Sequence, residues 1–144
     1  MFRRAAGGVE VLLAHPGGPF WASRDEASWT LPKGAVDEGE DPMAAAQREF
    51  TEETGFALQP PFQLLGELRQ KSGKRITAWA FEGDADPALL KSNHFEMEWP
   101  PRSGRMQSFP EVDRVGWFSL GEARRKLLPG QAPFLDALQR VLDL

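Results

Sequence analysis

Glu49, Glu52 and Glu53 have the residue type and the spacing that could hold a metal ion. In a helix, which rotates by about 100° per residue, positions i, i+3 and i+4 share one arc of the surface. Like charges at this spacing destabilise a helix, and a hard divalent cation removes the repulsion because it prefers carboxylate oxygens. Arg48 lies on the flank of Glu52 and can bind a carboxylate with both branches of its guanidinium. The spacing by itself is as typical of a solvated acidic face as of a Mg²⁺ site, with Mn²⁺ as an alternative ion, and the residues around it must decide between the two.

A carboxylate cluster of this kind suits the hydrolysis of a phosphoanhydride bond. The reaction needs charge neutralisation on the phosphate oxygens, a water molecule held in line, and a base or metal ion to deprotonate that water. The attacked atom is phosphorus, so no protein nucleophile is required. The complete absence of cysteine from the chain is then no obstacle.

The segment from Asp41 to Thr54 is predicted to be the helix that positions these carboxylates. Asp41 is a favourable N-cap, Pro42 suits the first helical position, and Gly55 favours termination. An adjoining arc of the same helix is apolar and is expected to face the core: Met43, Ala46, Phe50 and Thr54.

The rest of the chain alternates short strands with helices. Strands are predicted over Val9 to Ala14, Phe62 to Gln70, Arg75 to Glu82 and Val112 to Phe118, with a hairpin joining the middle two. Helices are predicted from the capping pair Ser119 and Glu122 to about Leu128, and over Phe134 to Leu142. The pattern predicts a single domain, residues 1–144, of the α/β or α+β class.

The stretch from Gly34 to Phe56 resembles the Nudix box of the Nudix hydrolase superfamily. It matches at every defining position: Gly34, Glu40, Arg48, Glu49, Phe50, Glu52, Glu53, Gly55 and Phe56. The resemblance implies an α/β/α sandwich with a mixed sheet and a loop–helix–loop metal site. It also implies Mg²⁺-dependent hydrolysis of a nucleoside diphosphate linked to another moiety.

The same resemblance assigns roles to individual residues. Glu49, Glu52 and Glu53 would be the metal ligands and Arg48 would hold them in register. The carbonyl of Gly34 would complete the shell, and Glu40 would support it or bind a further metal ion. The general base would be Glu53 or a residue from a loop that folds over the site, and the candidates there are Glu96, Glu98 and Glu111.

Basic and aromatic side chains outside the box are the candidate substrate contacts. The cations expected to bind phosphates are Lys33, Lys71, Lys74, Arg75, Arg102 and Arg105. Trp21, Trp29 and Trp99 are expected to stack on a base, whereas Trp79 and Trp117 fall in predicted strands and are expected in the core. His15 and His94 lack a partner at metal-ligand spacing and are interpreted as structural or surface residues.

The segment from Trp29 to Gly34 resembles the one that leads into the box in diadenosine-polyphosphate hydrolases. Those enzymes usually carry a downstream tyrosine, and this chain has no tyrosine. The expected substrate is a dinucleoside polyphosphate or a nucleoside triphosphate. Alternatives are ADP-ribose or another diphosphate, or a nucleotide-sensing module without turnover, and the complete set of box glutamates argues against the last.

Composition narrows the possible partners and compartment. The formal net charge of −4 argues against a nucleic-acid partner, and no apolar stretch approaches the ~20 residues of a membrane span. The absence of cysteine and of an apolar signal-peptide core favours a cytoplasmic protein. Only a short strand fits before Gly7, and its exposed edge could pair with a second copy, so a monomer or a homodimer is expected.

Overall fold

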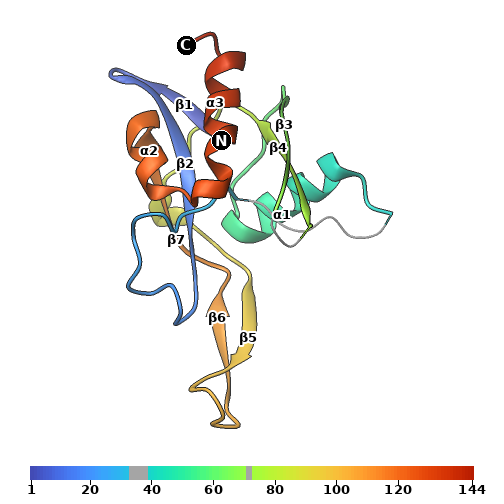
Figure 1. Ribbon diagram of the computed structural model, residues 1–144, viewed down its shortest axis with the longest axis vertical. Coiled ribbons are helices and arrows are strands. Elements are labelled where there is room, and N and C mark those ends of the chain that lie inside the picture. Colours follow the sequence, from blue (N-terminus) through green and yellow to red (C-terminus); the bar gives the residue numbers. More distant parts are fainter. Residues whose placement is uncertain (33–38, 71–72) are drawn as a thin grey trace.

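The computed structural model describes residues 1–32, 39–70 and 73–144. Figure 1 shows the arrangement of its elements. In chain order they are β1 (Phe2–Ala5), β2 (Gly8–Pro16), α1 (Pro42–Thr54), β3 (Gln63–Arg69), β4 (Arg75–Ala80), the 3₁₀ turn η1 (Pro87–Leu89), β5 (His94–Glu98), β6 (Met106–Pro110), β7 (Val112–Ser119), α2 (Leu120–Lys126), the 3₁₀ turn η2 (Pro129–Gln131) and α3 (Ala132–Val141).

The central sheet has the order β1-β2-β7, and both of its strand pairs are antiparallel. Side chains of β2 alternate between its faces. Leu12 and Ala14 pack in a cluster with Phe50 of α1, whereas Val11 and Leu13 pack in a second cluster with Leu135 of α3. Helices therefore cover both faces, which confirms the α/β/α sandwich.

A mixed sheet, with parallel as well as antiparallel pairing, was expected, and the parallel pairing is slight. Among the described residues it is confined to two isolated bridges, Phe2 with Glu82 and Trp29 with Leu127. The Phe2 amide also donates to the carbonyl of Phe81 (3.0 Å). The edge of β1, expected to be open, is therefore partly covered by the chain that follows β4.

Helix α1 begins and ends where the sequence predicts. The Asp41 carboxylate accepts the amide of Ala44 (3.0 Å), and Gly55 adopts a left-handed φ of 73° that ends the helix. A Cβ on Gly55 would lie 2.9 Å from the Cβ of Lys91, so glycine is needed for packing as well as for conformation. The expected core face needs one correction, because Ala45 is buried while Met43 and Ala46 are only half-buried.

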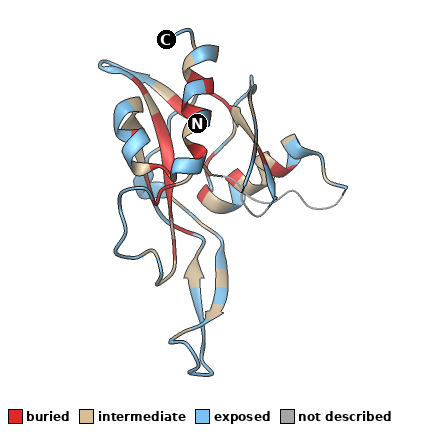
Figure 2. Ribbon diagram, in the orientation of Figure 1, coloured by how far each residue is buried: buried red, intermediate tan, exposed pale blue. Residues whose placement is uncertain are grey.

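The remaining strands form two separate hairpins. β3 pairs with β4, as the sequence predicts. β5 pairs with β6 in a hairpin that is not among the strands predicted from the sequence, and it extends from the end of the molecule opposite the C-terminus (Figure 1). We call this hairpin, residues 94–110, the arm. Its residues are exposed or half-buried, in contrast to the buried β2 (Figure 2).

No helix within the described residues is long and apolar enough to cross a membrane.

Candidate active site

The glutamates at the C-terminal end of α1 form an acidic stripe, which we define as Glu49, Glu52 and Glu53. The side chain of Glu49 is 18% exposed and that of Glu52 is 42% exposed. Glu53 is half-buried and follows the arc toward the apolar side of the helix. The stripe thus runs from solvent to the edge of the core.

Arg48 connects the stripe to the loop before the helix. Its Nε lies 2.9 Å from Oε2 of Glu40 and its Nη2 lies 3.0 Å from Oε1, which is a bidentate pair. Its Nη1 lies 3.0 Å from Glu49 Oε1 and 3.2 Å from Glu52 Oε2. Hydrogen bonding to Glu40 is the main cause that raises the pKa of Arg48, and the charges of Glu40, Glu49 and Glu52 add to it. Arg48 therefore stays charged and orients three carboxylates at once.

The acidic stripe has the donor chemistry that a Mg²⁺ ion requires. Within residues 1–32, 39–70 and 73–144, no three His, Cys, Asp or Glu side chains converge in a ready-made metal site. Glu49 and Glu52 turn toward Arg48 instead. The three glutamates of the stripe supply carboxylate oxygens, which are the ligands that Mg²⁺ prefers. Lys33 and Gly34, expected at the substrate and the metal, lie outside the described residues.

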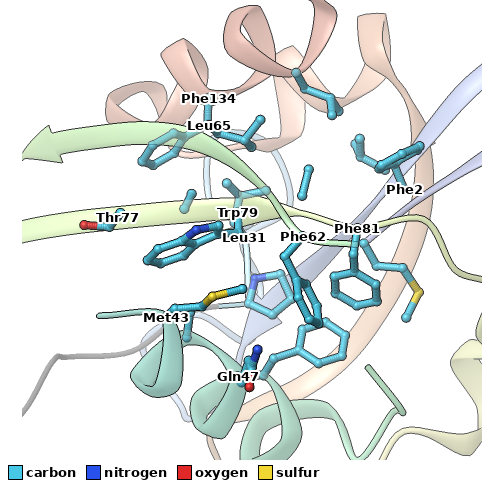
Figure 3. Close-up of a pocket in the computed structure, with 18 of the residues that line it drawn as sticks. Phe2, Leu31, Met43, Gln47, Phe62, Leu65, Thr77, Trp79, Phe81 and Phe134 are labelled. Carbon is cyan, nitrogen blue, oxygen red and sulfur yellow. The ribbon is translucent and has the colours of Figure 1, made fainter. Parts of the chain in front are cut away.

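A mainly apolar cavity of about 90 Å³ lies on the neighbouring face of α1. Met43 and Gln47 line it from the helix, Thr77 and Trp79 from β4, and Phe134 from α3 (Figure 3). The sequence predicted Trp79 to be core, yet its ring is half-buried and forms part of the cavity wall. Thr77 and Trp79 are two residues apart in β4 and therefore share one of its faces, and only the packing of α1 and α3 makes that face border a cavity.

Trp29 does not have the exposure expected of a residue that stacks on a base. It is only 4% exposed, and its ring packs edge-on against Phe118 at 5.0 Å and His15 at 5.2 Å. Its Nε1 donates to Oδ1 of Asp25 (3.1 Å). Its proline- and glycine-rich surroundings made Trp29 a candidate for stacking, but pairing of Thr30 with Ala14 of β2 draws this segment into the core.

The structure separates the candidate bases. Glu98 ends β5, and its carboxylate accepts the amide of Arg102 (2.6 Å) within the arm. Two backbone hydrogen bonds link Glu111 to α1. Its amide donates to Asn93 O (2.8 Å), and the Asn93 amide donates to Glu52 O (2.8 Å). Of the two, only Glu111 is tied by its backbone to the end of the acidic stripe.

The other candidate residues are scattered over the surface or buried. Arg102 and Arg105 are exposed at the end of the arm, and Lys74 and Arg75 are exposed at the β3–β4 turn; Lys71 lies outside the described residues. His15 is fully buried and bonded to Asp113, whereas His94 is exposed, which confirms their assignment as structural or surface residues. Glu96, a candidate base, is exposed on β5, and Trp21, a candidate for stacking, is half-buried. Trp117, expected in the core, is also only half-buried.

Carboxylates that an arginine organises on a helix of an α/β/α sandwich are side chains of the kind that metal-dependent hydrolases of phosphoanhydride bonds use. The chain belongs to the NUDIX domain family, whose profile matches residues 1–138. It is therefore a Nudix-type pyrophosphohydrolase.

Curated relatives carry the name RNA pyrophosphohydrolase. The protein from Caulobacter vibrioides is 48% identical over 129 residues, covering 72% of this chain and 74% of the relative. The protein from Photobacterium profundum is 34% identical over 122 residues, covering 78% of this chain and 67% of the relative.

Solved structures support the fold. The MutT protein from Methanosarcina mazei Go1 has a TM-score of 0.62 at 24% identity, covering 99% of this chain and 91% of the other. The NUDIX domain of Shewanella oneidensis NrtR, complexed with ADP ribose, has a TM-score of 0.65 at 17% identity, with coverages of 98% and 82%. A C. elegans Ap4A hydrolase has a TM-score of 0.57 at 24% identity, with coverages of 99% and 92%.

Proposed function

We propose that this chain, folding as one domain over residues 1–144, hydrolyses a phosphoanhydride bond of a nucleoside polyphosphate in a Mg²⁺-dependent reaction. The observation that carries the proposal is the Arg48 network, which ties Glu40 of the preceding loop to Glu49 and Glu52 of α1. Glu49, Glu52 and Glu53 would bind the metal, with the Gly34 carbonyl completing the shell. Bound there, Mg²⁺ would neutralise phosphate charge and acidify a water molecule.

The residues around the metal ligands have distinct tasks in this proposal. Arg48 keeps the carboxylates oriented through fixed hydrogen bonds, so little reorganisation is needed when substrate arrives. Glu40 holds Arg48 in turn by its bidentate pair. For the general base, backbone connectivity favours Glu111 over Glu98, and Glu53 is the alternative within the stripe.

The apolar cavity supports a substrate that carries a nucleobase. The ring of Trp79 offers a surface for stacking, and Gln47 and Thr77 are polar groups on the wall that could bond to base edges. The cavity and the acidic stripe occupy neighbouring arcs of one helix. A base in the cavity would therefore leave its phosphates near the glutamates.

Two substrate classes follow, each with its own support. A dinucleoside polyphosphate or nucleoside triphosphate fits the nucleobase cavity. The polyphosphate end of an RNA is the second candidate, because the relatives at 34% and 48% identity are named RNA pyrophosphohydrolase. The net charge of −4 argued against nucleic acid, but metal ions between the carboxylates and the phosphates would lessen that conflict.

The test is a substrate panel with Mg²⁺: dinucleoside polyphosphates, nucleoside triphosphates, ADP-ribose and 5′-triphosphorylated RNA. Products are separated by chromatography, and Glu52→Gln is assayed beside the wild type and beside Glu67→Gln, an exposed glutamate on β3. We expect one class to be cleaved, with Glu52→Gln slower by several powers of ten and Glu67→Gln normal. Binding of a nucleotide without cleavage of any substrate would instead identify a sensing module.

A further inference from the structure

The arm begins directly at the end of the acidic stripe. The amide of Asn93, one residue before β5, donates to the carbonyl of Glu52 (2.8 Å), and the amide of Lys91 donates to that of Thr54 (3.0 Å). Residues 91–93 are thus bonded to the last turn of α1. A ligand held at the stripe is adjacent to the root of the arm.

Loop 17–24 supports the arm along one face. Gly17 is in such close contact that a Cβ there would lie 1.8 Å from the carbonyl oxygen of Pro110. Further out, the rings of Phe20 and Trp99 meet edge to face, with centroids 5.4 Å apart and an interplanar angle of 81°. Phe20 nevertheless remains 61% exposed. The loop and the arm therefore present an aromatic surface to solvent.

The carboxylates of the arm lie on its opposite face. Phe95 and Met97 are half-buried and alternate along β5 with the exposed Glu96 and Glu98. A Cβ on Gly18 would lie 3.1 Å from the ring of Phe95, which places loop 17–24 on the apolar side. Along β5, the aromatic face is thus on the other side of the ribbon from Glu96, whereas the Glu98 carboxylate is engaged by the amide of Arg102 at the tip.

Two cations lie at the arm tip, residues 99–105, the segment that also carries Trp99. Arg102 and Arg105 are exposed, and within the described residues neither takes part in an ion pair. Arg102 also has a left-handed φ of 61°, an unusual conformation for a residue other than glycine, and Glu98 holds it there by accepting its amide. Aromatic rings interleaved with exposed arginines are the surface that single-stranded nucleic acids bind.

We propose that the arm is a binding surface for the single-stranded RNA that continues from a 5′ polyphosphate held at α1. Phe20 and Trp99 would stack on bases while Arg102 and Arg105 contact backbone phosphates. The five residues of β5 span about 17 Å, so a chain anchored at the stripe reaches the tip within a few nucleotides. This inference rests on the proposed function and selects its RNA alternative.

The experiment measures binding and turnover separately. A fluorescent single-stranded oligoribonucleotide with a 5′ hydroxyl is titrated by anisotropy across several salt concentrations, with no metal added. In Arg102→Ala/Arg105→Ala we expect weaker binding and a salt slope smaller by about 1 for each arginine removed. Phe20→Ala should weaken binding about fivefold or more with the salt slope retained. The matched control Arg69→Ala/Arg140→Ala removes the same charge from exposed sites off the arm and should bind like the wild type.

Turnover measurements then test whether RNA binding at the arm increases the rate of RNA hydrolysis. For the double arginine variant, kcat/KM for a 5′-triphosphorylated oligoribonucleotide should fall relative to that for a nucleoside triphosphate. An equal loss in both double arginine variants would show a general charge effect and would overturn the proposal. A change in molecular mass by light scattering in Phe20→Ala would reassign the surface to contact between copies of the chain.

The two proposals can fail separately. Cleavage of nucleoside triphosphates by a wild type that binds no oligoribonucleotide would retain the hydrolase and remove the arm surface. Oligoribonucleotide binding that depends on Arg102 and Arg105, with no cleavage of any substrate, would retain the arm surface and remove the proposed reaction.

Discussion

The acidic stripe and the apolar cavity lie on neighbouring arcs of α1, yet they are built in different ways. The stripe and its organiser come from one short segment, because Arg48 bonds to Glu40, Glu49 and Glu52, which lie close to it in the chain. The cavity combines α1 with β4 and α3, which are far apart in the chain. One helix thus joins a local reaction centre to a recognition surface assembled by the tertiary fold. Substitutions on the two arcs should therefore affect different kinetic constants.

The largest effect is expected at the general base. Glu111→Gln should lower kcat by about 10²- to 10⁴-fold and remove the acidic limb of the pH–rate profile, because a glutamine cannot accept the proton of the water. The measurement is kcat against pH for Glu111→Gln, Glu53→Gln and Glu98→Gln with the best substrate of the panel. Loss of the limb in Glu53→Gln alone would assign the base to the stripe. The same loss in Glu98→Gln alone would show that the arm moves onto α1 during turnover.

A smaller loss is expected when the stripe keeps its carboxylates but loses their organiser. Arg48→Ala should weaken the apparent Mg²⁺ affinity by about 10- to 100-fold, because Glu49 and Glu52 are no longer held in position. Mg²⁺ activation curves and Mg²⁺-dependent thermal stabilisation both report this affinity. Arg48→Lys retains the charge without the bidentate geometry and should recover only part of it. Full recovery of the Mg²⁺ affinity in Arg48→Lys would mean that a positive charge at this position is sufficient, without the bidentate geometry.

The smallest effect is expected in the cavity. Trp79→Ala should raise KM about fivefold or more with kcat nearly unchanged, because stacking on the base stabilises the bound substrate and the transition state alike. Trp79→Phe keeps an aromatic surface and should restore most of the affinity. The control is Trp117→Phe, a half-buried tryptophan of β7 outside the cavity. A fall in kcat at constant KM would contradict the division of tasks between the two arcs.

Local sequence signals predicted the helix and its stripe well. The caps at Asp41 and Gly55 depend on neighbouring backbone atoms, and residues three and four apart must share a helix face. The bidentate capacity of Arg48 was likewise predicted. Its partner, Glu40, could not be derived from helix periodicity because it lies in the preceding loop.

Aromatic side chains were harder to place because their burial depends on distant partners. Trp29 appeared to be a surface residue among prolines and glycines, but bridges to β2 and to Leu127 bury it. Trp79 appeared to be a core residue because it lies in a strand, but that strand borders the cavity. In both cases local composition indicated the opposite of the environment that packing creates.

The sequence by itself determined the reaction class, since the carboxylates, their spacing and the helix that carries them all lie between Gly34 and Phe56. Only the tertiary structure decided which aromatic ring borders the cavity, which acidic residue outside the stripe is tied to α1, and which way the β5–β6 arm extends. The physical reason is the range of the interactions. Helix geometry and capping act over a few residues, whereas burial and strand pairing depend on segments that meet only when the whole chain folds.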